Sequence, residues 1–189
     1  MSDWPVGLST GCFSQTNILE CLDTVRNGGF CMVEVCSFPA HLDYHDREKV
    51  RATADMMHSL GMEAYSFHAP FSSSIDITAL DAQQKEHSVT EITLAAEAAA
   101  ILGCRHFVIH PGPERSYRPP AEELFARMAN AAGVLAKVAT RCNELGTHCV
   151  LENMLPHLLF GHTSNILWIM GALEKARVGT CLDTGHAYL

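Results

Sequence analysis

Short apolar runs with period-two alternation and longer segments with helical spacing follow each other along the whole chain. The runs that predict strands are residues 6–12, 31–37, 62–68, 105–110, 148–153 and 177–183. The segments between them that predict helices are residues 17–27, 46–60, 80–102, 120–145 and 163–176. The fourth helix, for example, carries Leu124, Met128, Leu135 and Val138 at the spacing that places side chains on one helix face.

Strict alternation of six strands and five helices predicts right-handed crossovers and an all-parallel sheet. Such a sheet belongs either to a barrel or to a doubly wound open sheet. The barrel is favoured because no Gly-x-Gly-x-x-Gly follows the first strand. Polar residues also recur at the strand ends, which suits a barrel because every strand of a barrel contributes residues to the same open end. We therefore expect a single α/β domain over residues 1–189, comprising about the first six units of a (β/α)8 TIM barrel.

The composition narrows the classes of protein further. A chain of 189 residues is long enough to bury a core, and no apolar run is long enough to span a bilayer. The eight cysteines form no Cys-x-x-Cys pair, which indicates reduced core thiols and, together with the lack of a secretion signal, a cytoplasmic protein. A net charge of −8 argues against broad nucleic-acid binding.

Ionisable or amide side chains stand at or just beyond five of the predicted strands. They are Glu34, His68, His110, Glu152, Asn153, Asp183 and His186. Because the carboxyl ends of parallel strands meet at one edge, we expect these side chains to converge. Buried carboxylates need a partner or a metal, and oxygen and imidazole ligands suit zinc, manganese or iron.

Each residue taken alone has a simpler structural explanation. A single histidine at a strand end is more often a hydrogen-bonded rim residue than a ligand. Glu152 could pair with an arginine, Asp183 could cap a following helix, and His186 could be a turn residue. Glu34 could form a structural salt bridge. Their joint occurrence favours a shared polar site.

Two loops leave alternatives open. Residues 113–118 contain two arginines and a tyrosine that could contact a phosphate or a sugar, or could be solvated. Residues 153–162 are unusually apolar for a loop and could form a lid over the site or a surface for another subunit.

Four motifs in order resemble the strand-end motifs of the xylose isomerase-like barrels. They are His68-Ala69-Pro70-Phe71, His110-Pro111-Gly112, Glu152-Asn153 and Asp183-Thr184-Gly185-His186. That superfamily includes sugar and sugar-phosphate isomerases and epimerases, and the abasic-site nucleases of the endonuclease IV type. The resemblance runs from the first strand to the last residue.

The resemblance implies a divalent metal ion (Mn, Zn, Co, Mg or Fe) held by Glu152 and Asp183. His186 would lie beside the substrate or on a second metal, and Glu152 and His186 would be the catalytic residues. In the nuclease branch His68 and His110 would also ligate zinc, whereas in the epimerase branch they would line the substrate pocket with Glu34 and Asn153. Because family members continue into strands seven and eight, we expect the natural protein to be longer, at about 250 residues.

Three hypotheses follow for the function. The leading one is a metal-dependent isomerase or epimerase of a small sugar, sugar phosphate or polyol, with proton transfer next to a metal-polarised carbonyl. The second is a zinc phosphodiesterase, which 13 Lys+Arg against 21 Asp+Glu disfavours because it needs a basic groove. The third is a barrel fragment that folds only by association, since an open sheet leaves edge strands unpaired. A homo-oligomer is one possibility that the sequence leaves open.

Overall fold

The computed structural model describes residues 4–113 and 119–188 and contains one six-stranded sheet with helices packed against it. The strands are β1 (Leu8–Ser9), β2 (Met32–Cys36), β3 (Glu63–His68), β4 (His106–Ile109), β5 (His148–Glu152) and β6 (Gly179–Cys181). The helices are α1 (Ile18–Asn27), α2 (Arg47–Ser59), α3 (Ala82–Ile101), α4 (Ala121–Glu144), α5 (Thr163–Ala172) and α6 (Thr184–Tyr188). Two short 3-10 helices are η1 (Thr10–Phe13) and η2 (Glu174–Ala176). Most of the loop of residues 113–118, for which contact with a phosphate or sugar and solvation are the open alternatives, lies outside the described part of the chain, at residues 114–118.

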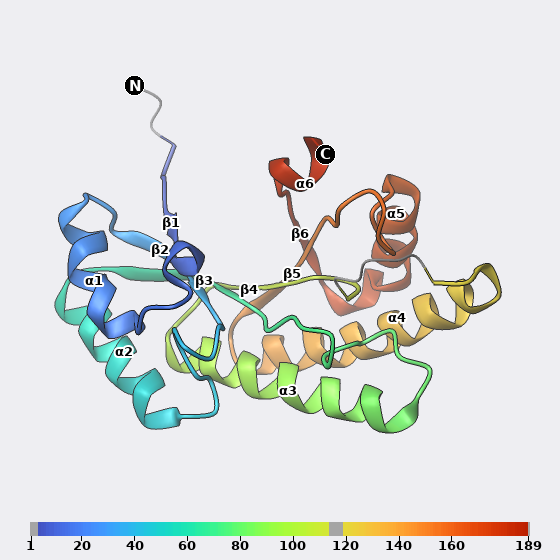
Figure 1. Ribbon diagram of the computed structural model, residues 1–189, viewed down its shortest axis with the longest axis horizontal. Helices are drawn as coiled ribbons and strands as arrows, with labels where there is room; N and C mark the ends of the chain where they lie inside the picture. The colour runs from blue at the N-terminus through green and yellow to red at the C-terminus, as the bar shows by residue number, and fades with distance from the viewer. Residues whose placement is uncertain (1–3, 114–118, 189) are drawn as a thin grey trace.

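The strands follow one another across the sheet in chain order, and every neighbouring pair is parallel. This confirms the predicted α/β alternation and the partial TIM barrel. Figure 1 shows the sheet as an open trough, with β1 and β6 at its two edges and the long helices α3 and α4 along one side. The other side of the trough carries the candidate site.

Alternation along the strands separates a core face from a polar face. Val33, Val35, Phe67, Phe107 and Leu151 are buried in the hydrophobic core between the sheet and its helices. Because successive side chains of a strand point to opposite faces, the intervening residues of the same strands line the concave side. No helix among the described residues combines the length and the apolar character needed to cross a bilayer.

The two edge strands are shorter than the sequence predicts. β1 contains only Leu8 and Ser9, because the Ser9 hydroxyl accepts a hydrogen bond from the Gly11 amide and caps the 3-10 turn that follows. The Thr10 hydroxyl accepts a hydrogen bond from the backbone amide of Cys36. A side chain thus takes the backbone hydrogen bond that would have continued the pairing of β1 with β2. At the other edge, β6 is confined to Gly179–Cys181 instead of residues 177–183.

The apolar side chains of the loop after β5 are mostly buried within the chain itself. Met154, Leu158, Leu159 and Phe160 are all less than 5% exposed and belong to the hydrophobic core. Phe160 lies with its ring 3.2 Å from the position that a Cβ atom would take at Gly112. The loop is therefore apolar because it fills the space between the strand ends and the core.

Candidate metal centre and active site

The structure brings together five of the residues that the sequence predicts to converge. His68 ends β3, His110 directly follows β4 and Glu152 ends β5, so parallel pairing aligns them at one edge of the sheet. Asp183 and His186 reach the same place from the turn after β6 and from α6. Two overlapping groups, His68 with His110 and Glu152, and Glu152 with Asp183 and His186, each offer ligand atoms that lie within 4.8 Å of one another.

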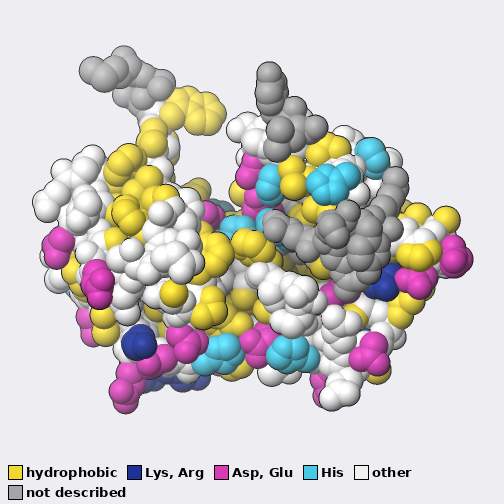
Figure 2. Space-filling model, in the orientation of Figure 1, with side chains coloured by type: hydrophobic (Ala, Val, Ile, Leu, Met, Phe, Trp, Pro, Cys, Tyr) yellow, Lys and Arg dark blue, Asp and Glu magenta, His cyan; other side chains and the backbone are white. Residues whose placement is uncertain are grey.

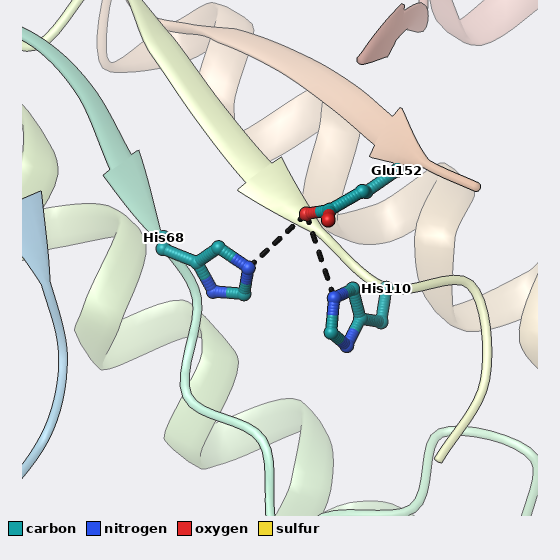
Figure 3. A group of neighbouring side chains, drawn as sticks. All are labelled: His68, His110 and Glu152. Carbon is teal, nitrogen blue, oxygen red and sulfur yellow. Dashed lines mark hydrogen bonds and ion pairs between the residues drawn. The ribbon is translucent and has the colours of Figure 1, made fainter. Parts of the chain in front are cut away.

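One carboxylate oxygen of Glu152 is the centre of the first group. Its Oε2 atom lies 3.1 Å from Nε2 of His68 and 3.4 Å from Nε2 of His110, as Figure 3 shows. The three side chains are 8, 13 and 5% exposed respectively. Two ligand atoms on one tetrahedral zinc ion, each about 2.0–2.1 Å from the metal, are about 3.4 Å apart. The observed spacing fits ligands that share a cation.

His68 has an oxygen acceptor at each of its ring nitrogens. Its Nδ1 atom lies 2.9 Å from the backbone carbonyl of Ala69, and its Nε2 atom faces Glu152. A neutral imidazole carries only one N–H group, so it can satisfy only one of these acceptors. The arrangement needs positive charge at Nε2, either a second proton or a metal ion. A metal-binding histidine whose other ring nitrogen donates to a backbone carbonyl has this geometry.

The pKa shifts of Glu152 and His68 agree with positive charge at Nε2 of His68. Burial raises the pKa of Glu152, but the hydrogen bonds from His110 and His68 outweigh burial and hold that pKa far below the usual range of a carboxyl group. Burial lowers the pKa of His68, and the bonds to Glu152 and the Ala69 carbonyl outweigh it and raise the pKa above its ordinary value. Glu152 is therefore a charged carboxylate in a nearly buried position.

Asn153 holds the second group in place. Its side-chain oxygen accepts a hydrogen bond from the Asp183 amide at 2.7 Å, and its side-chain nitrogen donates to the Asp183 carbonyl at 2.9 Å. Its backbone carbonyl lies 2.8 Å from Nδ1 of His186. Both ends of the Asn153 amide are thus used within the chain, and Asn153 is not among the described residues that line the cavity, so its contact with substrate stays a prediction.

Asp183 forms the helix cap that the sequence leaves as an alternative, and its other carboxylate oxygen faces the ligand candidates. Its Oδ1 atom caps α6 by accepting a hydrogen bond from the His186 amide at 2.8 Å. Its Oδ2 atom lies 3.8 Å from Nδ1 of His186, and Oε1 of Glu152 lies 3.5 Å from the same nitrogen. Since Nδ1 of His186 donates to the Asn153 carbonyl, the free lone pair of this imidazole is on Nε2.

Glu34 lies in the same cavity as the metal-ligand candidates and is held by two hydroxyl groups. Oε1 accepts a hydrogen bond from Ser9 at 2.7 Å, and Oε2 accepts one from Ser66 at 3.4 Å. The sequence prediction missed these two serines. Period-two alternation back from His68 points to Ser66, and the same alternation forward from Glu34 points to Cys36, because both residues lie on the concave face.

These residues surround a cavity of about 420 Å³ at the mouth of the trough. Its described lining residues are Ser9, Gly11, Glu34, Cys36, Phe38, His68, Phe71, His110, Glu152, Cys181, Leu182, Asp183 and His186. None of them is a lysine or an arginine. Figure 2 shows histidine and acidic side chains beside the hollow between the two edges of the sheet, whereas the lysine and arginine side chains on this face lie away from it.

A parallel sheet with histidine and carboxylate side chains at its carboxyl edge is the arrangement of a TIM barrel with a candidate metal site. Residues 22–189 match the xylose isomerase-like TIM barrel family, and the chain belongs to that family. Comparison of the sequence with curated proteins gives no match.

Solved structures share the fold. A D-tagatose 3-epimerase-like protein superposes with a TM-score of 0.81 at 21% identity, covering 96% of this chain and 65% of the other. An L-ribulose 3-epimerase gives a TM-score of 0.79 at 18% identity, covering 97% of this chain and 61% of the other. A protein from Thermus thermophilus, solved after soaking with ZnCl2, gives 0.70 at 21% identity, covering 98% and 69%. The chain thus spans less than two thirds of the length of the two epimerase structures.

Proposed function

We propose that this protein is a divalent-metal-dependent isomerase or epimerase that acts on a small sugar, sugar phosphate or polyol. The observation that carries the proposal is the environment of His68, whose two ring nitrogens both face oxygen acceptors. A cation beside Nε2 resolves this conflict, and the buried Glu152 carboxylate supplies the compensating charge. The family and the epimerase structures that share the fold support the reaction class.

His68, His110 and Glu152 would hold one metal ion, and Asp183 would complete the shell or hold a second ion with Glu152. A bound divalent ion would polarise the oxygens of the sugar and stabilise the negative charge that develops when a proton beside the carbonyl is removed. The donor set of imidazole nitrogens and carboxylate oxygens suits zinc, manganese, cobalt or iron.

Individual side chains of the protein would take the remaining roles in substrate binding and proton transfer. Glu152 has a pKa far below neutral pH, so it suits the role of ligand better than that of base, because an efficient base has a pKa near the working pH. His186 presents Nε2 for contact with a substrate hydroxyl or for moving a proton. Glu34, held by Ser9 and Ser66, would bind a further hydroxyl of the sugar.

The test measures metal binding first and turnover second. Calorimetric titration of the chain with Zn²⁺ and Mn²⁺ should show stoichiometric binding that Glu152→Gln abolishes and that the exposed Glu122→Gln leaves intact. A panel of aldoses and ketoses should then show interconversion that a chelator stops and added metal restores. Lack of divalent binding, or turnover that survives complete metal removal, would contradict the proposal.

A zinc phosphodiesterase is a second candidate that the same arrangement of ligands allows. Both His68 and His110 converge on Glu152, which is the arrangement expected if both histidines are ligands rather than pocket walls. The lack of lysine or arginine among the described cavity residues weighs against a DNA backbone. Cleavage of a duplex that contains one abasic site, measured with Zn²⁺ and with a chelator, distinguishes the two candidates.

A further inference from the structure

A second cavity of about 350 Å³ adjoins the candidate active site. It lies between the loop after β2 and the loop after β3, and Glu91 of α3 closes one side. Phe38 and Phe71 line both cavities, with ring centroids 5.8 Å apart in an edge-on arrangement. The ring of Phe71 also lies 5.2 Å from the rings of both His68 and His110. The two cavities therefore share a wall that touches the metal-ligand candidates.

A fixed polar cluster forms part of this second cavity, which we call the Asp43–Glu91 cavity. Oδ1 of Asp43 lies 2.9 Å from Nδ1 of His45, and Oε2 of Glu91 lies 3.1 Å from Nε2 of the same ring. Oε2 of Glu91 also accepts a hydrogen bond from the Tyr44 hydroxyl at 2.6 Å. His45 thus bridges carboxylates from the β2–α2 loop and from α3, and fixes the orientation of both.

The second oxygen of each carboxylate remains available to a ligand. Within the described residues, the hydrogen bonds of these two side chains are made by Oδ1 of Asp43 and by Oε2 of Glu91, which leaves Oδ2 of Asp43 and Oε1 of Glu91 for a bound molecule. Both carboxylates line the cavity. Oriented acceptors of this kind bind hydroxyl groups, and each charged acceptor adds a strong hydrogen bond.

The remaining lining selects among ligands. Phe38, Pro39, Pro70 and Phe71 offer apolar faces, on which the C–H face of a sugar ring can pack, and Ser72 and Ser74 add hydroxyl groups. No lysine or arginine is among the described lining residues, and two carboxylates with one histidine give no net positive charge. A phosphate group does not suit this chemistry, whereas a neutral hydroxylated ring does.

We propose that the Asp43–Glu91 cavity binds a second sugar ring of the substrate, while the first ring occupies the metal-site cavity. The preferred substrate is then a glycoside or a two-unit sugar, which should bind more tightly than a free monosaccharide or a sugar phosphate. This inference rests on the proposed function, because it assigns the first ring to the same metal site. The observation that carries it is that the two cavities adjoin, since Phe38 and Phe71 line both.

The test compares ligands of one and two rings on the metal-loaded chain. Calorimetry with glucose and galactose, and with maltose, cellobiose and lactose, should show at least one disaccharide that binds about 10-fold tighter than its monosaccharide, the effect of one added charged hydrogen bond. Glu91→Gln and Asp43→Asn should remove that advantage without changing monosaccharide affinity. Glu86→Gln, an exposed residue on the same helix, is the matched control and should keep it.

A second variant separates loss of contact from loss of fold. Ser74 is exposed and lines only the Asp43–Glu91 cavity, so Ser74→Trp should fill the space and block the second ring while leaving thermal unfolding unchanged. Equal affinity for one and two rings, or a disaccharide advantage that survives Ser74→Trp, would overturn the inference but leave the metal-dependent reaction standing. If glucosamine were the one sugar that bound, the two carboxylates would form a site for its ammonium group, and this result would also overturn the inference. Failure of the chain to bind either metal or any sugar would overturn both proposals.

Discussion

Asn153 and Asp183 bind each other through two reciprocal hydrogen bonds, from the Asp183 amide to Oδ1 and from Nδ2 to the Asp183 carbonyl. The pair replaces the ladder bonds that would continue β6 and turns the chain toward α6. It therefore sets the position of the Asp183 carboxylate and, through the Asn153 carbonyl, the orientation of the His186 ring.

Replacing Asn153 should weaken metal binding although Asn153 is no ligand. Asn153→Ala removes both bonds to Asp183, and loss of a group that orients ligands typically lowers metal affinity by about 10–100-fold. Calorimetric titration with Zn²⁺ measures the change. Asn165→Ala is the control, because among the described residues its side chain makes a single long hydrogen bond, 3.9 Å to the sulfur of Met128. Equal effects of the two substitutions would contradict a positioning role for Asn153.

Metal should stabilise the folded chain through Glu152. A ligand at 100 times its dissociation constant adds about 2.7 kcal/mol to the free energy of unfolding, since it binds only the folded state. We expect Zn²⁺ or Mn²⁺ to raise the midpoint of thermal unfolding of the wild-type chain and to leave that of Glu152→Gln unchanged. A similar rise in both proteins would place the metal elsewhere.

The bridge made by His45 should stabilise the fold only in a limited pH range. Burial lowers the pKa of His45, but its bonds to Asp43 and Glu91 outweigh burial and raise the pKa above 6.5. Burial raises the pKa values of both carboxyl groups, and their bonds outweigh it and lower them below 3.8 and 4.5. The stabilisation from His45 is thus lost as the pH rises through its raised pKa, and that from the carboxylates is lost as the pH falls through their lowered pKa values.

The unfolding midpoint of wild type minus that of His45→Gln should consequently be largest below the ordinary pKa of histidine, at about pH 5 to 6, and should shrink as the pH rises through the raised pKa of His45. His58→Gln, an exposed substitution on α2, serves as the control and should show no such profile. A difference that is constant with pH would mean that the bridge is not an ion pair.

Gly112, in the His110-Pro111-Gly112 motif, should not tolerate a side chain. A Cβ atom there would lie 3.2 Å from Cδ2 of Phe160, whose ring is fully buried. Gly112→Ala should lower the free energy of unfolding by about 1–3 kcal/mol, the usual effect of overpacking. Gly133→Ala should raise it by about 0.5–1 kcal/mol, because Gly133 lies within α4 with no atom within 4 Å of an added Cβ. Denaturant unfolding measures both.

The order of elements and the convergence of His68, His110 and Glu152 could be predicted because both depend on local pattern. Alternation along each strand decides which residues share a face, and parallel strands bring their carboxyl ends to one edge whatever the details of packing. The ends of β1 and β6 could not be predicted in the same way. Ser9 ends β1 by a local bond from Gly11, whereas the side chains of Thr10 and Asn153 accept backbone hydrogen bonds from residues that only the fold places beside them.

The sequence by itself therefore determined the family, the parallel sheet and the presence of a histidine and carboxylate site at its edge. Only the tertiary structure decided that the Asn153 side chain binds the backbone of Asp183, and that the apolar loop after β5 fills the core. It alone placed Glu91 of α3 beside Asp43 and His45, which are about 46 residues away in the chain. The physical reason is that hydrogen-bond partners and cavity walls depend on distances between distant segments, which no local periodicity encodes.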